Sequence, residues 1–308
     1  MNTGIKIIMG FVVVTLIWAT TPLAIKWSGQ GPGFLFGVTA RMMIGVGIML
    51  IIAYLKQVPL PRHRGAILTY FAAGLGIYGA MLSTYWSAQY IQSGFISVMF
   101  GLTPIATGVL AYFVLAERGL TSFKLVGIVL GILGLVIIFW RSLHAGQTVF
   151  YGIAAMCLAV FLHALSTVLV KRWHGELSSM TVTTGGMLVA APTYLMTWLL
   201  VDGQWPVSIP EHALWSILYL AVIATTVGFN LYYYILKHMP ASQVALLTLL
   251  TPVLALWIGR LFNHEVISEH AWLGTIFILG GMSLYQWGAL WLQQYRAKSK
   301  LMKQTTDL

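Results

Sequence analysis

Few residues of this chain can do polar chemistry, and the candidates lie within long apolar stretches. Arg41 is the only formal charge that we place well inside such a stretch. A guanidinium in hydrocarbon costs about 3 kcal/mol or more, so it must face protein or water. One role for Arg41 is to bind an anionic group such as a carboxylate. The alternative is a structural arginine that hydrogen-bonds carbonyls of a neighbouring helix.

Two more polar side chains, His163 and Asn230, also lie inside apolar stretches. Imidazole exchanges a proton near neutral pH, which suits a proton-coupled cycle, whereas a neutral histidine bound to one backbone carbonyl would be structural. Asn230 either binds a substrate or bridges two helices. If these residues form a binding site, we expect Arg41, His163 and Asn230 to converge on one central cavity.

Aromatic side chains could form the walls of that site. A ring with a polar tip suits an amphipathic solute, and anchoring at the membrane interface is the alternative. Neighbours on a helix point about 100° apart, so the three tyrosines at 232–234 cannot all line one path. The wall candidates are Trp18, Tyr85, Trp86 and Tyr233.

Two Thr-Pro pairs begin similar apolar stretches. Proline removes an amide donor and loosens a helix locally, so these pairs are either gating hinges or packing kinks. Glu117 and Glu265 end the same stretches, where each would latch a gate, attract cations or lie solvated near a loop. The hinge candidates are Thr103, Pro104, Thr251 and Pro252.

The sequence lacks the motifs that ATP hydrolysis, zinc catalysis and cysteine chemistry require. The chain has no GxxxxGK[ST] phosphate loop and no HExxH zinc motif, so ATP hydrolysis by that route is excluded. The single cysteine, Cys157, excludes a disulfide framework and a cysteine-based metal cluster. We therefore expect no cofactor, no metal and no catalytic residue, and hence no enzyme.

Membrane-spanning helices must position these residues. The 308 residues are 59% hydrophobic and only 8% charged, against about 25% charged in soluble proteins. From Gly65 to Ala116 there is no charged residue, and a span needs about 20 apolar residues. The alternating pattern of a membrane barrel is absent. We predict ten helices at roughly 6–26, 34–55, 66–87, 93–115, 122–140, 149–170, 178–200, 213–235, 242–262 and 271–292.

The positions of Lys and Arg predict the orientation. With the N-terminus in the cytoplasm, 13 of the 17 Lys and Arg residues fall at inner ends or tails, three at outer ends and one within a span. We therefore expect a bacterial inner-membrane protein with both termini cytoplasmic. The basic tail, 295–308, would anchor to anionic lipid, and we expect no nucleic-acid partner.

The chain also contains an internal duplication. Segment 102–117, LTPIATGVLAYFVLAE, matches segment 250–265, LTPVLALWIGRLFNHE, at an offset of 148. Glycines that align between the copies suit close helix contact, within the monomer or across a dimer. Offsets of 145 to 148 also align Trp18 with His163, Lys26 with Lys171, Tyr85 with Tyr233, Gly127 with Gly274, and Gly134 with Gly281.

Each copy then holds five spans, in residues 1–144 and 145–294. An odd number of spans forces the second copy to enter the membrane upside down, which would put Lys26 outside and Lys171 inside. Inverted repeats are a recurring architecture of secondary transporters. The predicted fold is an all-α polytopic membrane protein of ten transmembrane helices, arranged as two inverted five-helix repeats.

The pattern resembles the drug/metabolite transporter superfamily, and within it the EamA-type ten-helix transporters. The resemblance covers nearly the whole chain, through LIWATTPLAIK, TARMMIG, the segment from Tyr85 to Glu117 and the segment from Asn230 to Glu265. Such families export amino acids, other metabolites or drugs across the bacterial inner membrane, and some members handle riboflavin, nucleotide sugars or lipid-linked sugars. His163 departs from the family, in which tryptophan is commoner in the second repeat.

The resemblance implies a secondary-active transporter that exports a small amphipathic metabolite, an amino acid or related compound or a drug, by alternating access between the repeats. The alternatives are a lipid-linked sugar or glycolipid flippase, a membrane enzyme, and a vitamin- or nucleotide-type importer on the same fold. The expected partners are a small-molecule substrate, the lipid bilayer and protons as the coupling ion. The expected assembly is a monomer or a homodimer.

Overall fold

Helices make up the regular structure. The computed structural model describes residues 3–116, 121–142, 147–240, 244, 247–265, 269–270, 272–285 and 287–288, and these contain no strand. In hydrocarbon every backbone N–H and C=O must be paired internally, and a helix pairs them within one segment. The expected tail at 295–308, Glu117 and the ends of the last two expected spans lie outside these residues.

The helices of the first repeat are α1 (Thr3–Ser28), α2 (Phe34–Leu55), α3 (Arg64–Leu75), η1 (Gly76–Ala80), α4 (Met81–Ser87), α5 (Ser93–Phe100), α6 (Thr103–Val114) and α7 (Ser122–Ser142). Those of the second repeat are α8 (Gln147–Trp173), α9 (Ser179–Val201), α10 (Glu211–Tyr219), η2 (Leu220–Gly228), α11 (Phe229–His238) and α13 (Leu247–Asn263). A last helix covers Trp272–Tyr285. The segments η1 and η2 are π-helical and join the helices on either side of them.

Seven helical stretches among the described residues are long and apolar enough to cross a membrane. They coincide with the first four expected spans and with the sixth, seventh and eighth. Within the fifth and tenth expected spans, the apolar helical stretches Ser122–Gly134 and Trp272–Tyr285 are shorter. The protein is thus a multi-pass helical membrane protein, and the total of ten spans stays a prediction. The seven stretches are Ile7–Ser28, Phe34–Leu55, Arg64–Ser87, Ser93–Val114, Thr148–Trp173, Ser179–Val201 and Glu211–His238.

Matched helices run in opposite directions. At the end of α1, Lys26 Nζ donates to the Ile91 carbonyl, 2.8 Å away. The start of α8 lies at the same place, because Ser87 Oγ donates to the Gly152 carbonyl at 2.6 Å. Since α1 ends where its counterpart α8 begins, the second repeat is inverted relative to the first, as expected.

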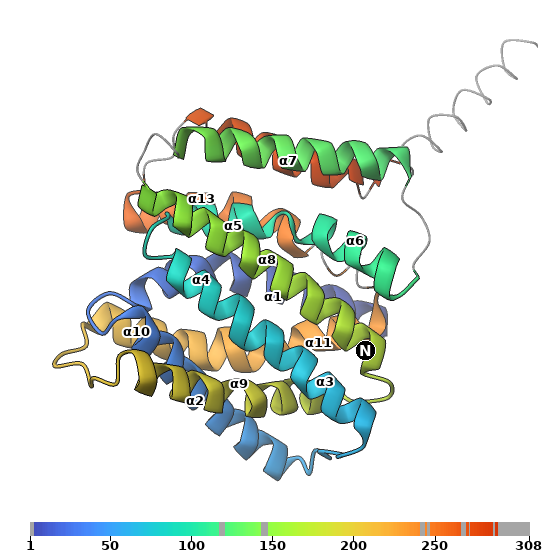
Figure 1. Ribbon diagram of the computed structural model, residues 1–308. Helices are drawn as coiled ribbons and strands as arrows, with labels where there is room; N and C mark the ends of the chain where they lie inside the picture. The colour runs from blue at the N-terminus through green and yellow to red at the C-terminus, as the bar shows by residue number, and fades with distance from the viewer. Residues whose placement is uncertain are drawn as a thin grey trace, which may run out of the picture.

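The two repeats interleave. Helix α1 packs against α10, η2, α11 and α13 of the second repeat, and α8 packs against α3, η1, α4, α5 and α6 of the first (Figure 1). We call these sets the α1 group and the α8 group. They meet where α5 packs against both α1 and α13, while α2 and α9 pack against each other. Each packing group therefore mixes helices of both repeats instead of following the sequence halves.

The two Thr-Pro pairs lie in different local structures. The span from Ser93 is broken after Phe100, and Pro104 falls in the first turn of α6, where a missing amide donor costs nothing. Pro252 instead lies inside α13. The break therefore makes α5 a separate half-helix that ends near the centre of the molecule.

Helix α7 and the last helix form a peripheral layer along one edge of the molecule (Figure 1). A side chain at Gly127 would place its Cβ 2.5 Å from the Gly281 carbonyl, and one at Gly134 would lie 2.6 Å from the Gly274 carbonyl. In the repeat alignment Gly127 corresponds to Gly274 and Gly134 to Gly281, so each of the two contacts maps onto the other, as a twofold axis requires. The glycines therefore serve contact within the monomer, where they let two backbones touch.

We predict that Gly281→Ala destabilises this layer, because the new Cβ would lie 2.6 Å from the Gly127 carbonyl. The expected loss in the free energy of unfolding is about 1–3 kcal/mol, measured by thermal denaturation in detergent. Gly280→Ala is the matched control, since nothing lies within 4 Å of its Cβ. Equal stability of the two variants would contradict the contact.

Candidate functional site

A cavity of about 60 Å³ lies where α1, α2, α5, α8 and η2 approach one another. Both repeats therefore contribute to it, and the helices of both groups line it. Among the described residues its walls combine aromatic and aliphatic side chains with one guanidinium, one imidazole and several hydroxyls; none of the lining residues is acidic. They are Trp18, Thr21, Pro22, Ile25, Arg41, Met81, Ile96, Ser97, Phe100, His163, Ala224, Phe229 and Thr251.

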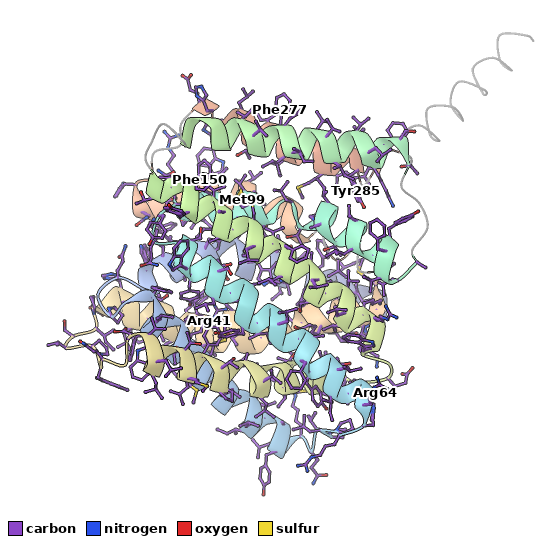
Figure 2. All side chains as sticks on the ribbon, in the orientation of Figure 1. Arg41, Arg64, Met99, Phe150, Phe277 and Tyr285 are labelled. Carbon is purple, nitrogen blue, oxygen red and sulfur yellow. The ribbon has the colours of Figure 1, made fainter. Side chains whose placement is uncertain are left out.

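Arg41 is the charged residue of this cavity. Its side chain is 1% exposed, and Figure 2 shows it in the interior among the helices. Its Nε donates to Thr225 Oγ1 at 2.7 Å, and Nη1 makes a longer bond of 3.4 Å to the Tyr85 hydroxyl. Two hydroxyls in place of backbone carbonyls thus stabilise the buried charge, which satisfies the requirement for a partner.

The partners of Arg41 come from both groups of helices. Tyr85 belongs to α4 in the α8 group, and its ring also lies 5.9 Å from the guanidinium carbon. Thr225 belongs to η2 in the α1 group. The five residues of η1 align with the last five of η2 at the offset of 148, and π-helical turns are frequent at functional sites.

Trp18 and His163, which the repeat aligns, meet at the cavity. Their ring centroids are 5.9 Å apart with the planes at 76°. Tyr232 contacts both rings, at 5.2 Å from Trp18 and 5.6 Å from His163, and Phe100 contacts His163 at 5.8 Å. Equivalent residues touch only near the axis that relates them, so this ring cluster marks the centre of the molecule.

The sequence-based candidates divide into two sets. Trp18, Arg41, His163 and Thr251 line the cavity, and Tyr85 reaches it through Arg41. Arg41 and His163 thus meet at one cavity as expected, whereas Asn230, which was expected there with them, does not line it. The other candidates lie outside the lining residues: Trp86, Thr103, Pro104, Asn230, Tyr233 and Pro252.

Of this second set, Trp86 packs on Tyr90 with ring centroids 4.9 Å apart. Tyr233 packs behind the cavity against Phe229 and Tyr232. The Oδ1 atom of Asn230 and the Oγ1 atom of Thr103 are buried without a hydrogen-bond partner among the described residues. Asn230 therefore joins neither the Arg41 cluster nor a described interhelical hydrogen bond through its oxygen.

Sequence reasoning missed Thr225, Phe100 and the contacts of Tyr232. Thr225 and Thr226 are adjacent hydroxyls in an apolar span, and this polar pair was the available signal for the partner of Arg41. Tyr232 was recognised as one of three consecutive tyrosines, of which the repeat alignment favoured Tyr233 for the wall. No polar or motif signal distinguishes Phe100 from the other phenylalanines.

Glu265 is buried, which corrects the expectation of a solvated carboxylate near a loop. It is 9% exposed, and its Oε1 accepts a hydrogen bond from the Ser93 amide at 2.9 Å. The carboxylate thus binds the start of α5, where helix amides lack partners within the helix. Its counterpart Glu117 lies outside the described residues.

Comparison with known proteins identifies a family. The model of the EamA-like transporter family matches residues 5–140 and 150–286, once for each repeat. A solved crystal structure with 18% sequence identity superposes with a TM-score of 0.66 and covers 91% of this chain and 96% of its own, which indicates a shared fold.

Several relatives by sequence are named as transporters or efflux pumps. The uncharacterized transporter YoaV of Bacillus subtilis is 26% identical over 284 residues, 90% of this chain and 96% of its own length. Protein PagO of Salmonella typhimurium is 24% identical and covers 89% of this chain and 90% of its own. A probable amino-acid metabolite efflux pump of Escherichia coli is 25% identical, covering 68% of this chain and 72% of its own.

We predict that Thr225→Val destabilises the protein, because it removes the acceptor of Arg41 Nε and leaves that donor buried. A hydrogen bond to a charged group contributes about 1.5–3 kcal/mol, so the loss should reach that range in thermal or denaturant unfolding. Thr226→Val is the matched control, since the Thr226 hydroxyl only bonds the Ala221 carbonyl of its own helix at 2.9 Å. A smaller loss for Thr225→Val than for Thr226→Val would contradict the role of Thr225.

Proposed function

The chain belongs to the EamA-like transporter family, and we propose that it exports a small amphipathic metabolite across the bacterial inner membrane by secondary active transport. The family and the names of its relatives make it a transporter and not an enzyme. In the proposed arrangement both termini are cytoplasmic. The repeats are residues 1–144 and 145–294, and the basic tail follows at 295–308.

The observation that carries this proposal is the cavity in which Arg41, Trp18 and His163 come together. The two bonds of Arg41 to hydroxyls leave other guanidinium N–H donors for a carboxylate, which accepts them in pairs. The rings beside it offer an apolar surface for the rest of the solute. A substrate with a carboxylate and an apolar or aromatic part, such as an amino acid, fits this chemistry.

The size of the cavity supports alternating access. Its volume of about 60 Å³ is well below the roughly 300 Å³ at which ligand pockets begin. A metabolite therefore enters only when the α1 group and the α8 group part at one end of the molecule. The inverted repeats give two equivalent ways to part, one toward each side of the membrane.

The names of relatives support the amino-acid class. Two of them, from Escherichia coli and Salmonella typhimurium, are named as probable amino-acid metabolite efflux pumps. The chain covers 72% and 69% of their lengths at 25% and 26% identity. A lipid-linked sugar flippase and a vitamin or nucleotide importer remain the alternatives that the same experiment tests.

We predict that the purified protein in proteoliposomes exchanges radiolabelled amino acids in a counterflow assay, and that Arg41→Gln lowers this exchange at least roughly tenfold through loss of the carboxylate contact. Arg41→Lys, which keeps the charge, should retain part of it. Folding of each variant is checked by thermal denaturation. Exchange of vitamins or nucleotides alone, movement of a labelled glycolipid alone, or no exchange across the panel would contradict the proposal.

We also propose protons as the coupling ion, with His163 as the exchanging group. His163→Gln should then change the dependence of transport on external pH, because glutamine cannot bind and release a proton. Arg41 lines the same cavity, so Arg41→Lys serves as the control for a change in this cavity that leaves its charge and its titrating histidine in place. An unchanged pH profile in His163→Gln would remove the histidine from the coupling step.

A further inference from the structure

Lys26, near the end of α1, binds the backbone at the end of another helix. Its Nζ donates to the Ile91 carbonyl at 2.8 Å and makes a longer contact of 3.5 Å with the Ala88 carbonyl. These carbonyls belong to the turn that directly follows α4, which ends at Ser87. The lysine is partly buried, so its charge depends on these acceptors more than a charge in bulk water would.

Lys171, near the end of α8, repeats this interaction. Its Nζ donates to the carbonyls of Leu236 and Met239, at 2.7 and 2.9 Å, where α11 ends. Lys171 aligns with Lys26 at an offset of 145, and both acceptors align with Ala88 and Ile91 at 148. One interaction thus occurs twice, related by the internal twofold.

The two lysines lie at opposite ends of the molecule. A side chain at Gly152 would place its Cβ 2.9 Å from Ile91, so this part of α8 lies beside the Lys26 contact. Lys171 follows 19 residues later on the same helix, a distance of roughly 28 Å at about 1.5 Å per residue. Lys26 and Lys171 therefore bind carbonyls at opposite ends of the molecule. At the Lys171 end, Lys237 Nζ also donates to the Glu176 carbonyl at 3.1 Å.

Both contacts cross from one group of helices to the other. Lys26 lies in the α1 group, and its acceptors follow α4 of the α8 group. Lys171 lies in the α8 group, and its acceptors follow α11 of the α1 group. When two groups rock, contacts inside a group persist, while contacts between groups at the opening end must break.

A second contact reinforces the Lys26 end. The Glu265 carboxylate, at the end of α13 in the α1 group, accepts hydrogen bonds from the amides of Ser93 and Gly94 at 2.9 and 3.2 Å. The segment between α4 and α5 is thus bound by Lys26 at its carbonyls and by Glu265 at its amides. Charge-assisted bonds of this kind are about twice as strong as neutral ones.

The backbone places Glu265 for this contact. His264 has a left-handed φ of 51°, which turns the chain back, and the Glu265 amide donates to the Gly259 carbonyl at 3.2 Å. A Cβ at Gly259 would lie 2.5 Å from Glu265 Oε2, so alanine at this position would push the carboxylate aside. Ala116, which aligns with His264, has the same turn with φ 52°.

We propose that Lys26 and Lys171 are the two gate latches of this transporter, each closing one end by binding the carbonyls that end a helix of the opposite group. Glu265 is part of the Lys26 latch. With both latches closed the cavity is occluded, and release of one opens that end alone. The inference rests on the alternating-access step of the proposed function, and it adds which residues hold each end shut.

Side-specific labelling tests the latches without any substrate. In the full chain with Cys157→Ala, a single cysteine replaces Ser97, which lines the cavity and is 3% exposed. A membrane-impermeant maleimide is applied to vesicles of known orientation, from either side. Lys26→Met should raise the labelling rate from the Lys26 end at least roughly tenfold, and Lys171→Met should do so from the other end.

Two further variants sharpen this test. Gly259→Ala displaces the Glu265 carboxylate and should raise labelling from the Lys26 end only. Lys124→Met removes the same charge from the peripheral layer, where Lys124 lies 5.5 Å from the Tyr285 ring centroid, and should leave labelling unchanged. A merely structural lysine would lower thermal stability without making labelling one-sided.

The proposal is overturned if both lysine variants raise labelling from the same side, or from both sides equally, or if neither differs from Lys124→Met while all three remain folded by gel filtration. Counterflow in the same vesicles separates the two proposals. Reciprocal labelling without exchange of any solute would support the latches and contradict the proposed function. Amino-acid exchange without reciprocal labelling would support the proposed function and contradict the latches.

Discussion

A guanidinium buried in an apolar helix bundle must find its partners inside the protein, and this constraint organises the centre of the molecule. Arg41 projects from α2 and donates a hydrogen bond to one hydroxyl in each group of helices, those of Thr225 and Tyr85. Arg41 therefore lies at the boundary between the two groups. The cavity lies at that boundary, between the aromatic rings and this buried guanidinium.

Much of this architecture could be predicted from the sequence. The positions of charged residues and the length of the apolar runs identify the helices, and the matched segments at an offset of 148 identify the inversion. The convergence of Arg41 and His163 also follows from simple physics, since each polar side chain at depth needs a protein or water environment. Such constraints act on single residues or on single helices, so one sequence is enough to read them.

Other features depend on packing that one sequence does not encode in a readable form. The alignment shows that α1 and α8 are equivalent, but it does not show that each inserts into the opposite repeat. The repeat alignment pairs Tyr85 with Tyr233, but it does not show which of the neighbouring tyrosines faces the cavity, and Tyr232 is the one that contacts Trp18. Likewise, the fold of Glu265 back onto the start of α5 depends on a turn at His264.

The contact between Trp18 and His163 has a thermodynamic consequence. In a dimer of identical halves, the two conformations that such an axis exchanges would be isoenergetic, and each would be populated equally without a driving gradient. In the proposed cycle the two rings would exchange surroundings, so an indole facing an imidazole would break this degeneracy at the axis itself. Gene duplication would then supply two exchangeable conformations, and divergence at a few axial positions would set which of them is favoured at rest.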